Sequence, residues 1–160
     1  MAREGSASCY LDGVIYCFAG QDKHGNYLQS IERLAYAYDP RAQASASWNL
    51  IELVDLTPRS RPVVVVLNST EILIMGGDRS FDDSCNDVLI LKIPAMKCTK
   101  LADSGLDGFT AWGNQSVTYA EDKVVAYVRV KSEEQPPKSC VITYKKGDRS
   151  VTVIDEFVKY

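Results

Sequence analysis

The chain has 160 residues, of which 46% are hydrophobic and 24% are charged, and its formal net charge is -3. These values are typical of one globular domain, and the mildly acidic balance argues against binding to nucleic acid or to an anionic membrane surface. No apolar run reaches the roughly 18 residues of a membrane span, and the first residues lack the apolar core of a signal peptide.

Strand signals dominate the first third of the chain. Bulky β-branched and aromatic residues flank Asp12-Gly13, a dipeptide that favours a tight hairpin turn. Four strands are predicted here, at 6–12, 14–20, 31–40 and 47–53. The third of these could also be written as a helix, but its place in a repeating pattern favours a strand.

The same order of strands then returns twice. After Thr57-Pro58, strands are predicted at 62–68, 71–77, 86–94 and 97–103, and then at 114–120, 123–130, 139–146 and 150–157. The runs VVVV and ILIM show no polar alternation, which is typical of strands buried on both faces. We therefore predict an all-β chain with three four-stranded antiparallel units, approximately residues 1–56, 57–104 and 105–160.

A pair of small residues ends the second strand of the first two units, Ala19-Gly20 and Gly76-Gly77. Glycine has no Cβ atom and adopts backbone angles that other residues avoid, so we expect other backbone segments to approach these positions closely. Repeated units of four antiparallel strands are the blades of a β-propeller.

This pattern resembles the kelch repeat family. Its marks in the first unit are an aromatic residue, a small pair, a Tyr-Asp-Pro segment and a spaced tryptophan, at Tyr16, Ala19-Gly20, Tyr38-Asp39-Pro40 and Trp48. The second unit keeps Gly76-Gly77 but has Lys97 or Cys98 at the tryptophan position, and the third lacks the glycine pair. The resemblance is strongest in the first unit and weakest in the third.

The resemblance implies a partial kelch-type β-propeller, because three blades are fewer than the roughly four to eight of a closed ring. Open edges would be covered by the missing blades of a longer chain, by a second copy in a two-fold ring, or by another protein. The implied function is a cytoplasmic protein-interaction module, a scaffold or adaptor without enzymatic activity, cofactor or metal. The alternatives are part of an enzyme of the sugar epimerase or oxidase type, and a structural subunit of a large assembly.

Kelch propellers usually bind partners through one face, which is built from the loop after the second strand and the segment leading into the first. By position, the resemblance selects Arg3, His24, Tyr27, Arg61, Arg79, Phe81, Asp82 and Asp83, with Asp22, Lys23, Arg59, Asp78, Glu133 and Glu134 beside them. In kelch-type ubiquitin-ligase adaptors, which PRSRPVVVVLN resembles, such arginines hold acidic peptide segments by charge-assisted hydrogen bonds. The alternatives are local pairing or solvation for the arginines, and packing onto its own blade for Phe81.

Other reactive side chains indicate no chemistry of their own. His24 is the single histidine, too few for a zinc or copper site, and nothing in its spacing selects a nucleophile. The acidic group Asp78, Asp82, Asp83 and Asp87 suggests calcium, but it matches no EF-hand loop, and turn aspartates are commonly solvated.

The five cysteines form no C-x-x-C motif and are expected to be reduced thiols, although Cys9 and Cys17 flank a turn and could form a cross-strand bridge. The two tryptophans, Trp48 and Trp112, are expected to pack in the core or between blades.

Overall fold

The structure is a computed structural model that describes residues 2–37, 45–80, 83–101, 110–119, 123–131 and 138–154. In these ranges the chain forms strands, turns and bends, as the all-β prediction requires. Residues 30–37, which could have been a helix, form a strand. The described part of the chain contains no helix that is long and apolar enough to cross a membrane.

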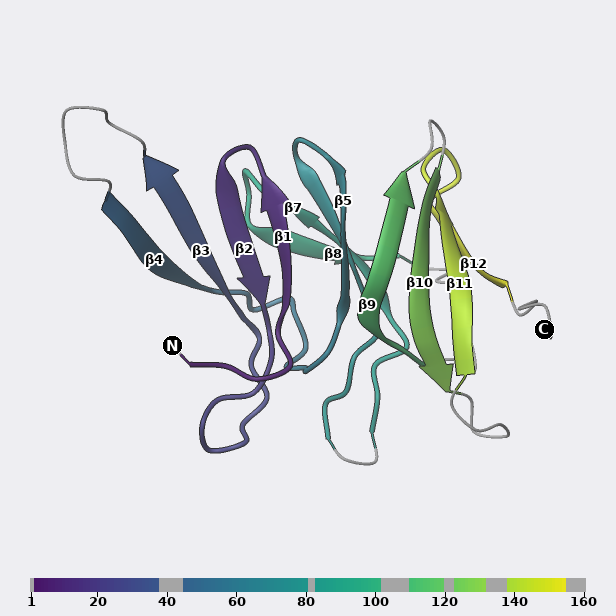
Figure 1. Cartoon of the computed structure of the whole chain (residues 1–160), viewed down its shortest axis with the longest axis horizontal. Coiled ribbons are helices and arrows are strands. Elements are labelled where there is room, and N and C mark those ends of the chain that lie inside the picture. Colours follow the sequence, from purple (N-terminus) through teal and green to yellow (C-terminus); the bar gives the residue numbers. More distant parts are fainter. Residues whose placement is uncertain are drawn as a thin grey trace.

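Within the described ranges, twelve strands form three four-stranded antiparallel sheets, as predicted (Figure 1). The first sheet contains β1 (Ala7–Leu11), β2 (Val14–Phe18), β3 (Ser30–Ala37) and β4 (Ser45–Glu52). The second contains β5 (Val63–Asn68), β6 (Glu71–Met75), β7 (Val88–Lys92) and β8 (Lys97–Lys100). The third contains β9 (Thr110–Tyr119), β10 (Lys123–Lys131), β11 (Lys138–Lys145) and β12 (Ser150–Ile154).

The sheets follow one another side by side, and the first strand of each contacts the first strand of the next. β1 lies against β5, and β5 lies against β9 (Figure 1). Each sheet is a meander in which successive strands are neighbours. The β1–β2 and β5–β6 turns therefore lie at one end of the molecule, and the loops that follow β2 and β6 lie at the other.

The second sheet is buried on both faces because it lies between the other two. Along β6, residues Ile72 to Met75 are all buried, and so are Val63, Val64 and Val65 in β5. This confirms the prediction made from the unbroken apolar runs. Alternate residues of these strands face opposite neighbours, so neither face of the sheet requires polar side chains.

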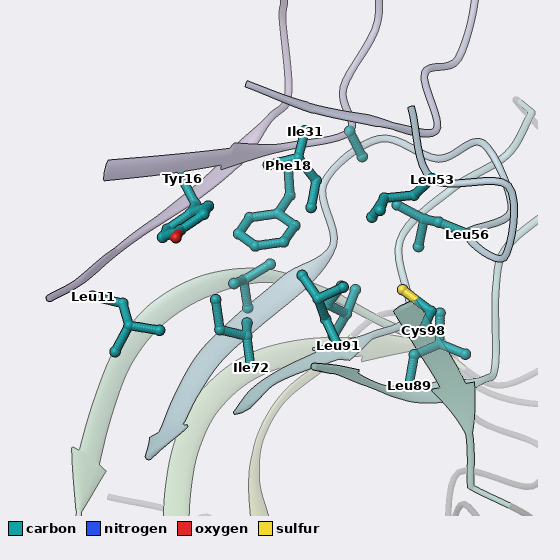
Figure 2. Packing of buried hydrophobic residues seen from close by; sticks show 13 residues of the cluster. Leu11, Tyr16, Phe18, Ile31, Leu53, Leu56, Ile72, Leu89, Leu91 and Cys98 are labelled. Carbon is teal, nitrogen blue, oxygen red and sulfur yellow. The ribbon is translucent and has the colours of Figure 1, made fainter. Parts of the chain in front are cut away.

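The core between the first two sheets is an apolar cluster with one aromatic pair at its centre (Figure 2). Tyr16 and Phe18 extend from β2 with their ring centroids 6.4 Å apart, and they meet Ile72 and Leu91 of the second sheet. Leu53 and Leu56, which follow β4, close the same cluster near Cys98. The connection between the two sheets thus contributes to the interface that it spans.

β9 begins earlier than predicted and pairs irregularly with β10. Its register with β10 skips Gly113 and Gln115, with shifts around Val128. A glycine suits a position where one strand carries an extra residue.

Cys9 and Cys17 are free thiols, and the suggested bridge between them is wrong. Cys9 lies opposite Tyr16, whereas Cys17 lies opposite Ser8. Directly opposed residues share a face of the sheet and neighbours along a strand alternate, so the two thiols lie on opposite faces. A disulfide cannot form through the sheet.

Burial is expected to make the thiols resist ionisation. It raises the pKa of Cys9 from its usual 9.0 to about 12, with Cys17 adding to the rise, and it raises the pKa of Cys98 to about 11. The contribution of these neutral thiols to the free energy of unfolding is therefore fully present below pH 9. It is lost as the pH rises through about 11 for Cys98 and about 12 for Cys9. We predict that thiolate absorbance appears at higher pH in the folded protein than in urea; identical titrations would contradict this.

Trp48 does not pack in the core or between the sheets described for this chain, so a single copy does not provide the packing predicted for it. Its side chain lies in β4 and is 51% exposed. It lies on the face of the first sheet that points away from the second sheet, and the described residues place no other sheet against that face. The side chain of Trp112 lies outside the described residues.

Candidate functional site

The loops that follow β2 and β6 gather with the segments that lead into β1 and β5 at one end of the molecule, which we call the loop face (Figure 1). The loop face comprises residues 2–6, 19–29, 57–62, 76–80 and 83–87. Backbone bridges join these segments, including Glu4 with Gln21, Leu28 with Arg59 and Ser60 with Asp78. A further bond runs from the Arg61 N–H to the Gly5 carbonyl at 2.6 Å. The loop face is therefore a connected framework across two sheets.

The small pairs make this framework possible. Gly20 and Gly77 have φ angles of +95° and +92°, and a Cβ atom on either would lie 2.7 Å or 2.6 Å from a carbonyl oxygen of Glu4 or Ser60. The close backbone approach predicted for these glycines is confirmed. The segments that approach the glycines are those that lead into β1 and β5. In each sheet, the glycine therefore lets the segment before the first strand pack against the end of the second strand.

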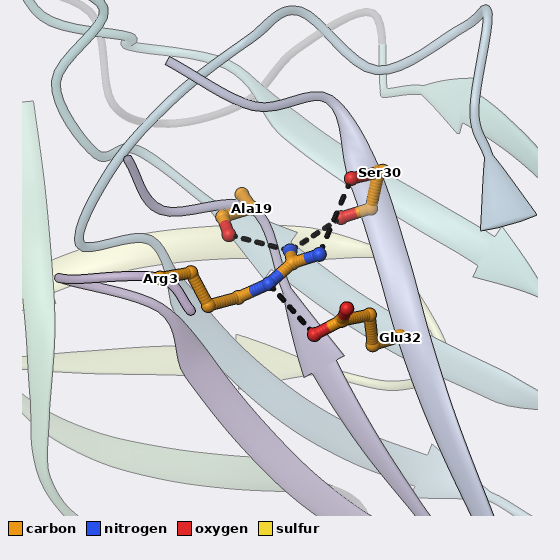
Figure 3. A network of polar contacts seen from close by, with 4 residues as sticks. All are labelled: Arg3, Ala19, Ser30 and Glu32. Atoms are coloured by element: carbon orange, nitrogen blue, oxygen red, sulfur yellow. Dashed lines mark hydrogen bonds and ion pairs between the residues drawn. The ribbon is translucent and has the colours of Figure 1, made fainter. Parts of the chain in front are cut away.

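Arg3 is held inside the loop face rather than presented on it (Figure 3). Its side chain is 5% exposed and lies 3.1 Å from a carboxylate oxygen of Glu32. It also donates to the carbonyls of Ala19 and Ser30, at 2.8 Å and 3.2 Å. The prediction that Arg3 is a rim residue is therefore corrected, because its donors are used to join the N-terminal segment to β3.

Arg59 has the equivalent role in the second sheet. Its side chain is fully enclosed, with 0% exposure, and binds both oxygens of Asp87 at 2.6 Å and 2.9 Å. It also donates to the Gly76 and Thr57 carbonyls at 2.9 Å and 3.0 Å. In both sheets, an arginine ahead of the first strand thus donates to the first residue of the small pair and to a carboxylate. Arg59 is a structural residue, not a rim group.

Arg61 is the arginine of this segment that reaches the surface. Its side chain is 59% exposed and contacts one oxygen of Asp78 through Nε at 2.9 Å and Nη2 at 2.6 Å. The other oxygen of Asp78 accepts a hydrogen bond from Ser84 at 3.2 Å. Asp78 itself is largely buried, so it holds the Arg61 guanidinium from the protein side. The opposite side of the guanidinium stays open to solvent.

Arg79 is a second surface guanidinium on the same face. Its Nε lies 2.6 Å from Asp83, and both side chains are 49% exposed. The hydrogen bond and charge of Asp83 raise the pKa of Arg79, which therefore remains cationic. The adjacent candidates Phe81 and Asp82 lie outside the described residues, as do Glu133 and Glu134.

The loop after β2 is organised by a single carboxylate. Asp22 accepts hydrogen bonds from the backbone N–H groups of His24 and Asn26, at 2.8 Å and 2.9 Å, and from the Asn26 side chain. The bonds from Asn26 lower the pKa of Asp22. This turn exposes Lys23 and His24 at its tip, and Tyr27 is half-buried beside Gln21.

Three of the four aspartates that suggested calcium do not converge on one point, and the fourth, Asp82, lies outside the described residues. Asp78 contacts Arg61, Asp83 contacts Arg79, and Asp87 contacts Arg59. In the part of the chain that the structure describes, no three His, Cys, Asp or Glu side chains are grouped closely enough to hold a metal ion. The acidic residues orient arginines instead.

The structure thus separates the predicted arginines into two kinds. The side chains of Arg3 and Arg59 are buried and donate hydrogen bonds within the protein. Those of Arg61 and Arg79 are exposed, and they present oriented, positively charged donors to solvent. Sequence reasoning did not identify the buried pairs. A signal existed, since both buried arginines precede a first strand by the same number of residues.

Comparison with known proteins identifies the fold. Residues 2–49 match the family model described as the Kelch motif. A solved structure reported as "Structure of YjhT", a kelch-type propeller, matches with a TM-score of 0.70 and 10% sequence identity, over 100% of this chain and 52% of that one. No curated protein matches in sequence. The first unit matches the Kelch motif, the chain as a whole has the fold of β-propeller blades, and it spans about half the length of the YjhT chain.

Proposed function

We propose that the chain is a protein-interaction module, a scaffold or adaptor, that binds an acidic peptide segment of a partner at the loop face. The observation that carries the proposal is the pair of exposed guanidinium groups, Arg61 and Arg79, each oriented by its own aspartate. Guanidinium–carboxylate hydrogen bonds are strong and directional, so cations held in place suit the recognition of carboxylates.

The framework beneath these arginines supports the same function. Arg59, two residues before Arg61, is locked to Asp87, and the backbone of Arg61 is bonded to Gly5. Little conformational freedom therefore remains to be lost in this segment when a partner binds, which favours affinity. The loop tip at Lys23 and His24 adds exposed basic and aromatic groups to the same end of the molecule.

The proposed cellular setting is the cytoplasm. Cys9, Cys17, Cys85 and Cys98 are all free thiols. Burial raises the pKa of each, so they suit a reducing compartment as inert core or sheet residues.

Charge reversal at both exposed arginines tests the function. We expect a panel of acidic peptides to contain sequences that bind the wild-type chain, and the double variant Arg61→Glu, Arg79→Glu to bind them about tenfold or more weakly. Fluorescence anisotropy of labelled peptides measures the affinity. The wild-type affinity should also decrease with salt, because part of the attraction is exposed to solvent.

A matched control reverses two lysines at the opposite end of the second sheet, Lys92→Glu and Lys97→Glu. Both positions are exposed and lie beside the β7–β8 turn. This variant changes the net charge by the same amount and should retain peptide binding. Equal losses in the two variants, or no loss in the first while thermal melts stay unchanged, would reject the loop face as the binding site.

A further inference from the structure

The first sheet has a largely apolar face that points away from the other two sheets that the structure describes. One row of directly opposed residues crosses all four strands on this face: Tyr10, Ile15, Leu34 and Trp48. A second row beside it contains Ser8, Cys17, Glu32 and Leu50. We call these eight residues the outer face. Tyr10 is 67% exposed, and Ile15, Trp48 and Leu50 are also exposed.

The repeat shows what the outer face is built to do. In the second sheet, the row that corresponds to the one from Tyr10 to Trp48 contains Val66, Ile72, Leu91 and Cys98. Ile72, Leu91 and Cys98 are buried there in the cluster shared with the first sheet (Figure 2). The same register position is therefore a sheet-packing surface in one unit and an uncovered surface in the other.

The side chains of the outer face indicate that the surface packed against it is mostly apolar. The row near the β1–β2 turn is entirely apolar, and monomeric proteins seldom expose a contiguous patch of this kind without a use for it. Toward the loop face, a pocket of about 290 Å³ is lined by Arg3, Cys17, Glu32 and Trp48. The occupant must therefore tolerate a polar margin at that end.

We propose that a second copy of this chain covers the outer face, with its third sheet (β9–β12) packed against the first sheet described here. Two observations select this occupant. The chain matches a propeller of which it spans 52%, so two copies have about the length of one such chain. The first and third sheets also lie at opposite ends of the row (Figure 1).

A two-fold axis satisfies both ends at once. It places the first sheet of each copy against the third sheet of the other, so the two new interfaces are identical and the assembly closes without leaving an open face. This proposal is independent of the peptide-binding function, since the outer face lies on the side of the first sheet and the loop face lies at one end of the molecule.

Light scattering coupled to size-exclusion chromatography tests the proposal. The wild-type chain should elute with twice its mass of 17.7 kDa. The Trp48→Glu variant should dissociate to a monomer, with a dimer affinity reduced about tenfold or more, because it places a charge at an aromatic anchor that the proposed dimer buries. Leu50→Glu should act in the same direction if the tryptophan variant fails to fold.

Val54 supplies the matched control, because it is apolar and 85% exposed but lies in the turn after β4 rather than on the outer face. Val54→Glu should leave the dimer intact. A wild-type monomer at every soluble concentration would overturn the proposal and point to blades from another polypeptide. A dimer that persists in folded Trp48→Glu and Leu50→Glu would also overturn it.

Discussion

Replacing Arg59 with methionine is expected to lower the free energy of unfolding by about 3 to 5 kcal/mol, the usual effect of removing one partner of a buried ion pair. The side chain is fully enclosed, and it satisfies both oxygens of Asp87. Without it, the carboxylate of Asp87, which is only 14% exposed, would lose its partner, and the Gly76 carbonyl would lose its donor. Urea unfolding followed by circular dichroism measures the difference.

Arg79 is the control for this experiment, because its ion pair with Asp83 is exposed. Arg79→Met should lower the free energy of unfolding by less than about 1 kcal/mol. Adding Asp87→Asn to the Arg59→Met variant should restore part of the loss by removing the uncompensated charge. Similar losses for Arg59→Met and Arg79→Met would show that the enclosed pair has no special structural role.

Replacing Gly77 with alanine is expected to destabilise the protein by roughly 2 to 5 kcal/mol, from backbone strain and a steric clash together. At a φ of +92°, the new Cβ atom would lie 2.6 Å from the Ser60 carbonyl and 3.1 Å from the Pro62 nitrogen. Both are backbone atoms, so relief requires the segment leading into β5 to move. The shift in the urea midpoint reports the loss.

Substitution of Gly13 measures the cost of backbone strain without a steric clash. Its φ is +79°, but no atom lies within 4 Å of the Cβ position. Gly13→Ala should therefore cost only the strain of a left-handed backbone, about 1 to 2 kcal/mol. If Gly77→Ala costs no more than Gly13→Ala, close backbone approach is not the reason for glycine at the small pairs.

Local signals were sufficient to predict the strands and their grouping. Asp12-Gly13 specifies a tight hairpin through its turn geometry, and the unbroken apolar runs of β5 and β6 indicate burial on both faces. These signals depend only on neighbours in sequence or in the same sheet. Of the candidate site, Arg61, Arg79 and Asp83 lie at the surface of the loop face, where the resemblance placed them.

Neighbouring residues in the sequence could not predict which side chains are buried. Arg59 and Arg61 are two residues apart and chemically identical, yet one is fully buried and the other is 59% exposed. The difference arises because Asp87 and the Gly76 carbonyl, distant in sequence, surround one guanidinium and not the other. The resemblance supplied positions along the chain. Position alone does not tell whether an arginine is buried in an internal ion pair or exposed at the surface of the loop face.

The amino-acid sequence by itself determined the three strand quartets and the two glycine pairs, since alternation, turn chemistry and backbone freedom act over a few residues. Only the tertiary structure decided that Arg3 joins Ala19 to Glu32 and that Trp48 lies uncovered. Both outcomes depend on whether a second segment of chain occupies the adjacent space. Equivalent rows of the first and second sheets differ for that reason, because burial is a property of the neighbour as much as of the residue.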